Sequence, residues 1–356
     1  MHKLCRFAAT AVVSLAAVTA QAAQQRSFVA SDGLDTNPCT RSAPCRSFGS
    51  AIAQTLPGGE VIVIDSAGYG PVAITGPISL IAPAGVYAGV TVSSGNGIAI
   101  NAGPSDLVVL RGLSINNVAT GTAGIVVSSA SRVMIDRCAI SRFGGPGTGI
   151  ELSMSSFVNV DVVDTVINDN AVGVEFTNTT FAEVTLSRVR LVSNNTGIDV
   201  VGSAAQLRLV DATISNSSGD ALHINPAPGA SVRFDIQRGE IIGNNIAVNA
   251  APFGAGSTVI GTISGLLAVE NGSFGIVANS VGATATLYVR DSVVRYNNSG
   301  LRAQGAGSTI VFRDNLIADN GFGIQSVTGA ALLTGLGNTM YNNTTPGAPT
   351  GTVSPI

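Results

Sequence analysis

A heptapeptide that recurs along the chain constrains the fold more than any other feature. It reads N-N-T-G-I-D-V at residues 194–200 and returns in variant form at residues 170–176, 244–250, 297–303 and 320–326. Including weaker copies, the steps average roughly 25 residues, a period that is typical of solenoid proteins. Although 356 residues could form two ordinary domains, this repeat predicts a single elongated one.

Each repeat contains three short apolar stretches separated by turns. In one repeat, alternating apolar residues at Val184 and Leu186 are followed by a polar kink at Arg188, a second stretch around Leu191 and a third around Ile198. Three strands in roughly 24 residues, with no helical pattern between them, form one coil of a parallel β-helix. The sequence therefore predicts an all-β, three-sheet parallel β-helix of about a dozen coils over residues 60–345.

The two ends of the chain differ from the repeat. Residues 1–22 have a basic start, an apolar run and a small-residue cleavage motif, which is typical of a secretory signal peptide. In residues 23–59, Phe48, Ile52 and Leu56 recur every four residues and predict a short capping helix over residues 46–56. Residues 346–356 are expected to form a frayed C-terminal tail.

Cleavage of the expected leader would leave three cysteines and an acidic chain. Cys39 and Cys45 flank a proline-containing loop, and export favours a disulfide between them, whereas Cys138 is expected to be a buried small hydrophobe. The loss of Lys3 and Arg6 changes the net charge from −3 to about −5. We therefore expect a secreted or periplasmic protein with no transmembrane segment in its mature chain and no nucleic-acid partner.

Two columns of equivalent residues are interpreted as structural. Asparagines in the turn before the third strand are expected to stack and hydrogen-bond. Their positions are Asn170, Asn194, Asn244, Asn297 and Asn320. Charged residues at the kink between the first two strands are expected to form an ion-pair ladder. These are Arg137, Asp164, Arg188, Asp211, Arg238, Asp291 and Asp314.

A third column is expected to face solvent along the third strand. It comprises Val126, Glu151, Glu175, Asp199, His223, Asn249, Val277, Arg302 and Gln325. Three successive carboxylates repel one another unless they are screened by solvent, protonated or bound to a cation. The column could therefore be a solvated surface, could bind Ca²⁺ through Glu151, Glu175 and Asp199, or could bind a glycan. A carboxylate beside a histidine could also be an acid–base pair.

The N-terminal segments N-P-C-T-R-S-A-P-C-R-S-F, P-G-G-E-V and G-Y-G-P-V-A-I resemble those of exported bacterial β-helix repeat proteins of unassigned activity. The repeat region resembles the right-handed parallel β-helix superfamily that includes pectin and pectate lyases and polygalacturonases. This resemblance implies a right-handed β-helix and, for an enzyme, a polysaccharide lyase or glycoside hydrolase acting on an acidic glycan. One fold carries many functions, so the resemblance predicts the scaffold better than the chemistry.

The catalytic motifs of polygalacturonases are only partly matched. Thr196 stands where their N-T-D-G motif carries an acid, Asp220 matches the second acid of their paired-Asp motif, and Ala247 falls where they carry glycine after histidine. The even repeat also leaves little room for groove walls. We therefore predict a non-catalytic surface or extracellular module that binds glycans or partners along its long face.

The alternative is a lyase or hydrolase that uses the same face. Asp220 and His223 would then be its acid–base residues. Glu151, Glu175 and Asp199 would be its metal or sugar ligands. The predicted substrate-binding residues are Asp199, Asn249 and Arg302.

Overall fold

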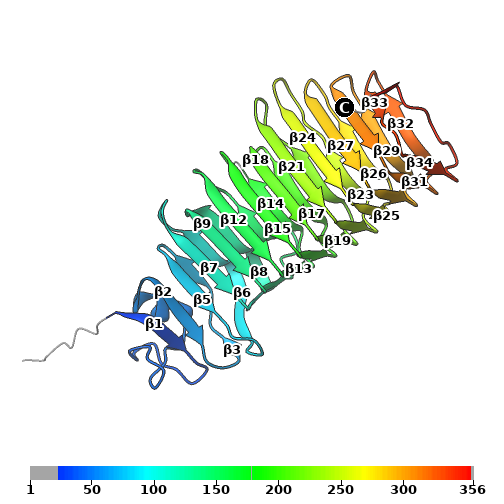
Figure 1. Ribbon diagram of the computed structural model, residues 1–356. Coiled ribbons are helices and arrows are strands. Elements are labelled where there is room, and N and C mark those ends of the chain that lie inside the picture. The colour runs from blue at the N-terminus through cyan, green and yellow to red at the C-terminus, as the bar shows by residue number, and fades with distance from the viewer. Residues whose placement is uncertain (1–22, 178, 354–356) are drawn as a thin grey trace, which may run out of the picture.

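A computed structural model describes residues 23–177 and 179–353, so the expected signal peptide lies outside the described residues. The chain forms a β-solenoid that ascends from its N-terminal to its C-terminal end (Figure 1). Equivalent strands of successive coils pair in parallel and in register, as between residues 182–187 and 205–210. The predicted all-β parallel β-helix is confirmed.

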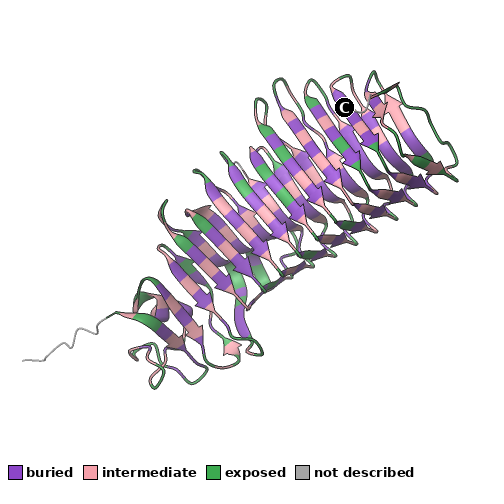
Figure 2. Ribbon diagram, viewed as in Figure 1, coloured by how far each residue is buried: buried purple, intermediate pink, exposed green. Residues whose placement is uncertain are grey.

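The first strand of each coil belongs to one sheet of 14 strands. Its members are β1 (Gln24–Val29), β2 (Thr55–Val63), β5 (Ile78–Ile81), β7 (Leu107–Arg111), β9 (Arg132–Asp136), β12 (Val158–Val163), β15 (Ala182–Ser187), β18 (Ala205–Val210), β21 (Ser231–Gln237), β24 (Thr258–Ser264), β27 (Thr284–Arg290), β30 (Ser308–Arg313), β33 (Ala331–Thr334) and β35 (Gly351–Thr352). Alternate residues of these strands are buried, as the banding in Figure 2 shows. This alternation packs the apolar side chains into a continuous core inside the coils.

Short strands and third strands form two further ladders. The short strands are β3 (Ala67–Gly68), β10 (Ala139–Ser141), β13 (Val166–Asn168), β16 (Arg190–Val192), β19 (Thr213–Ser215), β22 (Glu240–Ile242), β25 (Leu267–Val269), β28 (Val293–Arg295), β31 (Leu316–Ala318) and β34 (Thr339–Tyr341). The third strands are β4 (Val72–Ile74), β11 (Thr148–Leu152), β14 (Val172–Thr177), β17 (Thr196–Val201), β20 (Asp220–Asn225), β23 (Ile246–Ala250), β26 (Phe274–Asn279), β29 (Ser299–Gln304) and β32 (Phe322–Val327). The long strands β6 (Ala88–Asn101) and β8 (Leu113–Ser129) pass through both ladders, which joins them into one sheet.

Single residues in the left-handed conformation turn the chain between the strands of a coil. In one coil these are Arg188, with φ of 52°, and Ser193, with φ of 55°. A residue other than glycine in the left-handed conformation costs roughly 1–2 kcal/mol. Hydrogen bonds to the neighbouring coil offset this cost. The N–H groups of Arg188 and Ser193 donate to the carbonyls of Val210 and Ser215 in the next coil, each at 2.9 Å.

The charged residues at the first of these turns pair locally. Arg188 binds Asp164 of the preceding coil at 2.6 Å, and Arg238 binds Asp211 at 2.8 Å. These pairs are exposed, so solvent screens them and they contribute little to stability. Arg137 contacts its chain neighbour Asp136 at 3.3 Å, so the expected ladder consists of separate pairs.

The glycine before the apolar residue of the third strand is required by close packing. A Cβ atom on Gly197 would lie 2.4 Å from the carbonyl oxygen of Ala221 and 2.7 Å from Ile214. The coils can therefore stack at this slot only with a very small residue.

The asparagine column forms a buried amide ladder, which confirms its structural interpretation. The Nδ2 group of Asn170 donates to Oδ1 of Asn194 at 2.9 Å, and Asn297 donates in the same way to Asn320 at 3.0 Å. The ladder also includes Asn271 and Asn343, which the sequence analysis did not include. It is interrupted at one coil, where Ser217 occupies the slot.

The N-terminal helix is shorter than expected. Helix α1 spans Phe48–Ala53, and Ser47 caps it by accepting a hydrogen bond from the N–H of Ser50 at 3.3 Å. Leu56 lies instead in β2, because this segment pairs with β1 and extends the sheet. The solenoid sheet thus begins at β1, within the segment expected to be only a cap.

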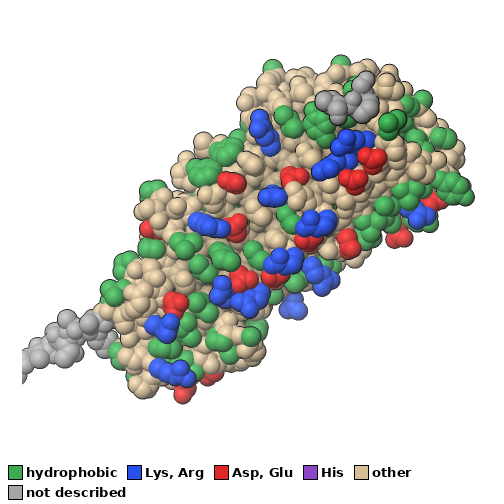
Figure 3. All heavy atoms as spheres, viewed as in Figure 1, with side chains coloured by type: hydrophobic (Ala, Val, Ile, Leu, Met, Phe, Trp, Pro, Cys, Tyr) green, Lys and Arg blue, Asp and Glu red, His purple; other side chains and the backbone are tan. Residues whose placement is uncertain are grey.

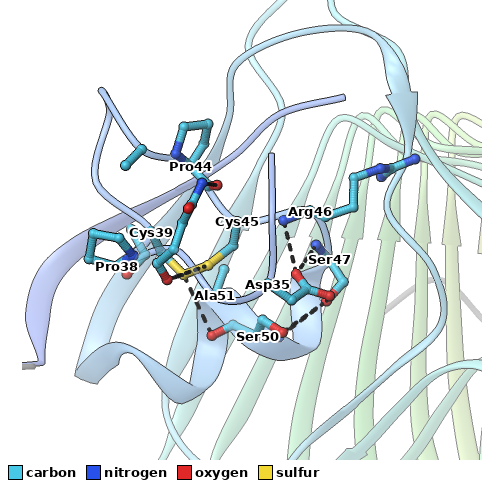
Figure 4. The surroundings of a disulfide bond; sticks show 12 residues. Asp35, Pro38, Cys39, Pro44, Cys45, Arg46, Ser47, Ser50 and Ala51 are labelled. Atoms are coloured by element: carbon cyan, nitrogen blue, oxygen red, sulfur yellow. Dashed lines mark hydrogen bonds between the residues drawn. A yellow bond between two sulfur atoms is a disulfide. The ribbon is translucent and has the colours of Figure 1, made fainter. Parts of the chain in front are cut away.

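The predicted disulfide joins Cys39 and Cys45 beside this helix (Figure 4). Asp35 holds the same region together, since its Oδ1 accepts from the N–H groups of Arg46 and Ser47, both at 2.9 Å. Cys138 is buried, as predicted, and burial raises the pKa of its thiol to about 12.

The C-terminal tail is not frayed where the structure describes it. Strand β35 pairs with β33, and the N–H of Val353 donates to the carbonyl of Thr334 at 3.0 Å. No helix among the described residues has the length and apolarity to cross a membrane.

Candidate functional site

The column predicted on the third strand exists in the expected register. We call it the third-strand row; its members pair in sequence from Val126 through Glu151, Glu175, Asp199, His223, Asn249, Val277 and Arg302 to Gln325. The polar members are half-buried, whereas Val277 is 4% exposed. The inward neighbours on the same strands are apolar and buried, which turns the row toward solvent.

The carboxylates of Glu151, Glu175 and Asp199 lie on adjacent strands of the row but do not form a metal cluster. Oε2 of Glu175 accepts a hydrogen bond from the Thr148 hydroxyl at 2.7 Å. Burial, with the nearby charge of Glu175, raises the pKa of Glu151. Within the described residues no three His, Cys, Asp or Glu side chains gather closely enough to hold a metal ion. A Ca²⁺ site at Glu151, Glu175 and Asp199 therefore stays a prediction.

Asp199 and His223 form a hydrogen-bonded pair on adjacent coils. His223 Nδ1 lies 2.8 Å from Asp199 Oδ1, and the two side chains are 26% and 21% exposed. Burial lowers the pKa of His223, but the hydrogen bond to Asp199 and the charges of Asp199 and Asp220 outweigh it. The net result is a raised pKa. The ring is therefore held in its charged form to higher pH than a free histidine.

Asp220 lies at the start of the strand that carries His223, and its charge acts on the histidine. Its Oδ2 accepts a hydrogen bond from Asn249 Nδ2 at 2.7 Å. Burial raises the pKa of Asp220, although the Asn249 hydrogen bond and the charge of His223 oppose this shift. We call Asp199, Asp220, His223 and Asn249 the acid–base patch.

Arg302 does not join this patch. It lies four strands beyond Asp199, roughly 19 Å at about 4.8 Å per strand. Its Nη1 donates to Gln325 Oε1 at 2.7 Å, and its guanidinium lies 5.1 Å from the Phe274 ring centroid. Of the predicted sugar contacts, Asp199 and Asn249 thus lie in the patch and Arg302 lies apart.

Aromatic residues flank the C-terminal half of the row, and the sequence analysis did not single them out. Phe274 pairs with Ser299, which pairs with Phe322, so the three form a second column three residues before the row. Phe322 is 38% exposed and Phe274 is half-buried. The sequence could have indicated this column, because each phenylalanine directly precedes the repeated glycine: Phe274 precedes Gly275 and Phe322 precedes Gly323.

A surface cavity of about 410 Å³ lies on the 14-stranded sheet instead, near the C-terminal end of the solenoid. Tyr288, Arg290, Arg313 and Leu336 contribute to its walls. None of these residues was predicted as a site residue, because none belongs to a column with a recognisable motif.

The comparisons with known proteins agree with the architecture. Residues 66–218 match the family model described as a right-handed β-helix region. No curated protein matches the sequence.

Two solved structures share the fold. The A-module of the Azotobacter vinelandii mannuronan C-5 epimerase AlgE6 is 15% identical with a TM-score of 0.59, covering 83% of this chain and 90% of its own. Pectate lyase Pel9A is 14% identical with a TM-score of 0.50, covering 89% of this chain and 78% of its own. With the parallel ladders, these likenesses show that the chain has a right-handed parallel β-helix fold.

Proposed function

We propose that this protein is an exported, non-catalytic module that binds a polysaccharide along the third-strand row. The observation that carries the proposal is the pairing of two columns on one rigid sheet. Polar side chains at Asn249, Arg302 and Gln325 run beside the aromatic column of Phe274 and Phe322. Sugar sites combine apolar faces with a few well-placed polar groups, and both recur here.

The polar groups are positioned before any ligand arrives. Arg302 is held by Gln325, by Oε1 of Gln304 at 2.8 Å and by the face of Phe274. Side chains fixed in this way lose less conformational freedom on binding, which favours affinity. Regular spacing of about 4.8 Å between strands repeats the contacts along a polymer.

Uronic-acid polymers are the first ligands to test. The two similar structures are named as a pectate lyase and a mannuronan epimerase, and both names refer to such polymers. A polyanion would be repelled by Glu151, Glu175 and Asp199 but attracted by Arg302. We therefore place binding in the half from Asn249 to Gln325, with Ca²⁺ as a bridge if the acidic half takes part.

Export is part of the same proposal. The Cys39–Cys45 disulfide is compatible with an oxidising compartment outside the cytoplasm. Recovery of the mature chain outside the cytoplasm, with an N-terminus near residue 23, would support it; retention of residues 1–22 in the cytoplasm would contradict it.

Affinity electrophoresis in gels containing polygalacturonate, polymannuronate or a neutral glucan tests the binding. Phe274→Ala and Arg302→Gln should each weaken retardation about tenfold, since each removes a contact worth roughly 1–2 kcal/mol. Arg238→Gln, an exposed arginine at a turn, is the matched control and should leave retardation unchanged. Wild-type mobility that no polymer alters would refute the proposal.

The acid–base patch supports a second candidate, a lyase or hydrolase. Asp220 and His223 lie together and both have raised pKa values, which is a known property of catalytic groups. Asp199 would orient the ring of His223 for proton transfer. Incubation with the same polymers, followed by ultraviolet absorbance and reducing ends, separates the two functions. Product formation that Asp220→Asn and His223→Gln both abolish would establish catalysis; product formation that survives both would refute these assignments.

A further inference from the structure

The cavity on the 14-stranded sheet combines charge with apolar walls. Residues from five successive strands or the turns after them line it: Thr262, Tyr288, Val289, Arg290, Val311, Arg313, Asp314, Gly335, Leu336 and Val353. Its volume of about 410 Å³ is in the range of small-molecule sites. In Figure 3, Arg and Asp or Glu side chains occur along the whole displayed face, and one group of them lies near its C-terminal end.

Two arginines line this cavity without a hydrogen-bond partner among the described residues. Arg290 and Arg313 are directly opposite each other on β27 and β30, so their like charges repel. Their nearest carboxylates, Asp291 and Asp314, lie 3.7 and 4.0 Å away. Neither guanidinium donates a hydrogen bond to any residue in 23–177 or 179–353. By contrast, Arg188 makes two to Asp164, at 2.6 and 2.9 Å.

The apolar walls arise from the shape of the last coils. Gly335 provides no side chain above Arg313, whose Cβ lies 2.8 Å from where a Cβ of residue 335 would be. Leu336, which is 75% exposed, and Tyr288, which is 47% exposed, both line the cavity. An aromatic ring, an aliphatic side chain and two partly exposed guanidinium groups therefore line the same cavity.

We propose that this cavity binds a uronate, a sugar ring that carries a carboxylate. The paired guanidinium groups of Arg290 and Arg313 would bind the carboxylate, since an arginine fork matches its two oxygens. The C–H face of the sugar ring would pack on Tyr288 and Leu336. Asp314 also lines the cavity and would accept a hydrogen bond from a sugar hydroxyl.

This site lies on a different sheet from the third-strand row, so the two proposals can fail separately. A polymer could bind the row while the cavity stays empty, and a uronate could bind the cavity without any binding to the row. Variants of one site are therefore controls for the other.

Isothermal titration calorimetry with trigalacturonate tests the inference, with maltotriose as the uncharged sugar and sodium sulfate as the bare anion. The full mature chain should bind trigalacturonate and neither of the other two. Arg290→Gln and Arg313→Gln should each weaken binding at least about tenfold, because each removes charge-assisted hydrogen bonds. Tyr288→Ala should weaken it by a smaller factor, while Arg208→Gln, on the same sheet but outside the cavity, should not.

Arginine side-chain NMR separates the sites. Trigalacturonate should shift the Nε–H signals of Arg290 and Arg313 even in the Arg302→Gln variant. Equal affinity in wild type and in both cavity variants would overturn the inference, as would sulfate binding as tightly as the uronate. If binding is lost only in Arg302→Gln, the row proposal stands and the cavity inference falls.

Discussion

Removing one amide from the buried ladder should destabilise the protein by an amount that follows from its contacts. Asn271 is 0% exposed, and its Oδ1 accepts from the backbone N–H and the Nδ2 group of Asn244, at 3.1 and 3.2 Å. Its Nδ2 donates to Oδ1 of Asn297 at 3.0 Å and to the carbonyls of Ile241 and Val269. Asn271→Ala removes all five hydrogen bonds.

The largest cost falls on the backbone of the preceding coil. The Nδ2 group of Asn244 keeps a partner at the Ile214 carbonyl, and Oδ1 of Asn297 keeps the N–H of residue 271. The backbone N–H of Asn244 loses its acceptor, Oδ1 of residue 271. A buried N–H group without a hydrogen-bond acceptor destabilises the folded state by about 1–3 kcal/mol. With the cavity left by the missing amide, we expect Asn271→Ala to lower the free energy of unfolding by about 3 kcal/mol.

Urea denaturation gives the total loss, and amide hydrogen exchange locates it. The N–H of residue 244 should exchange much faster in Asn271→Ala, while amides in distant coils keep their protection. Asn245→Ala is the matched control because Asn245 is exposed one residue further on; it should change stability by less than about 0.5 kcal/mol. A loss below about 1 kcal/mol, or unchanged protection at residue 244, would refute the reasoning.

Three further predictions follow from the ladder and the row. Ser217→Asn should stabilise the protein by about 1 kcal/mol in urea, because it supplies the missing amide; a destabilised variant would show that the coil cannot accommodate it. The folded pKa of His223 lies above its ordinary 6.5, so its pairing with Asp199 stabilises below that pH and is lost as pH rises through the folded value. The stability difference between wild type and His223→Gln should therefore be largest below about pH 6.5 and shrink as the pH rises above it, and a constant difference would contradict the pairing. Calcium chloride, but not equal ionic strength of sodium chloride, should raise the melting temperature of wild type and not of Glu175→Gln; equal shifts would exclude a site at Glu175.

The sequence predicts the coils and their register well because burial enforces both. A one-residue slip in β17 would turn Ile198 outward, so the position of Asp199 in the row follows from its apolar neighbours. The disulfide could be predicted because Cys39 and Cys45 flank a short loop and the protein is expected to be exported. The end of α1 did not follow, because pairing of β2 with β1 overrides the four-residue periodicity that includes Leu56.

Contacts between side chains were less accessible from the sequence. The repeat predicted that Asp199 and His223 lie on adjacent coils. Their hydrogen bond depends on side-chain rotamers, which the repeat does not determine. Arg302 was grouped with Asp199 by column, although four strands separate them. The cavity around Arg290 and Arg313 depends on where the last coils lack side chains, and only the three-dimensional arrangement places Gly335 above Arg313.

The break in the amide ladder gives one coil a distinct mechanical position. A solenoid is held together mainly by contacts between adjacent coils, so each coil boundary is a separate place where the stack can open. Within the part of the chain that the structure describes, the buried hydroxyl of Ser217 has no hydrogen-bond partner and no amide links Asn194 to Asn244 across this coil. The same coil carries Asp220 and His223. We therefore expect backbone amides at this coil boundary, beneath the acid–base patch, to exchange faster than those at boundaries that the amide ladder links.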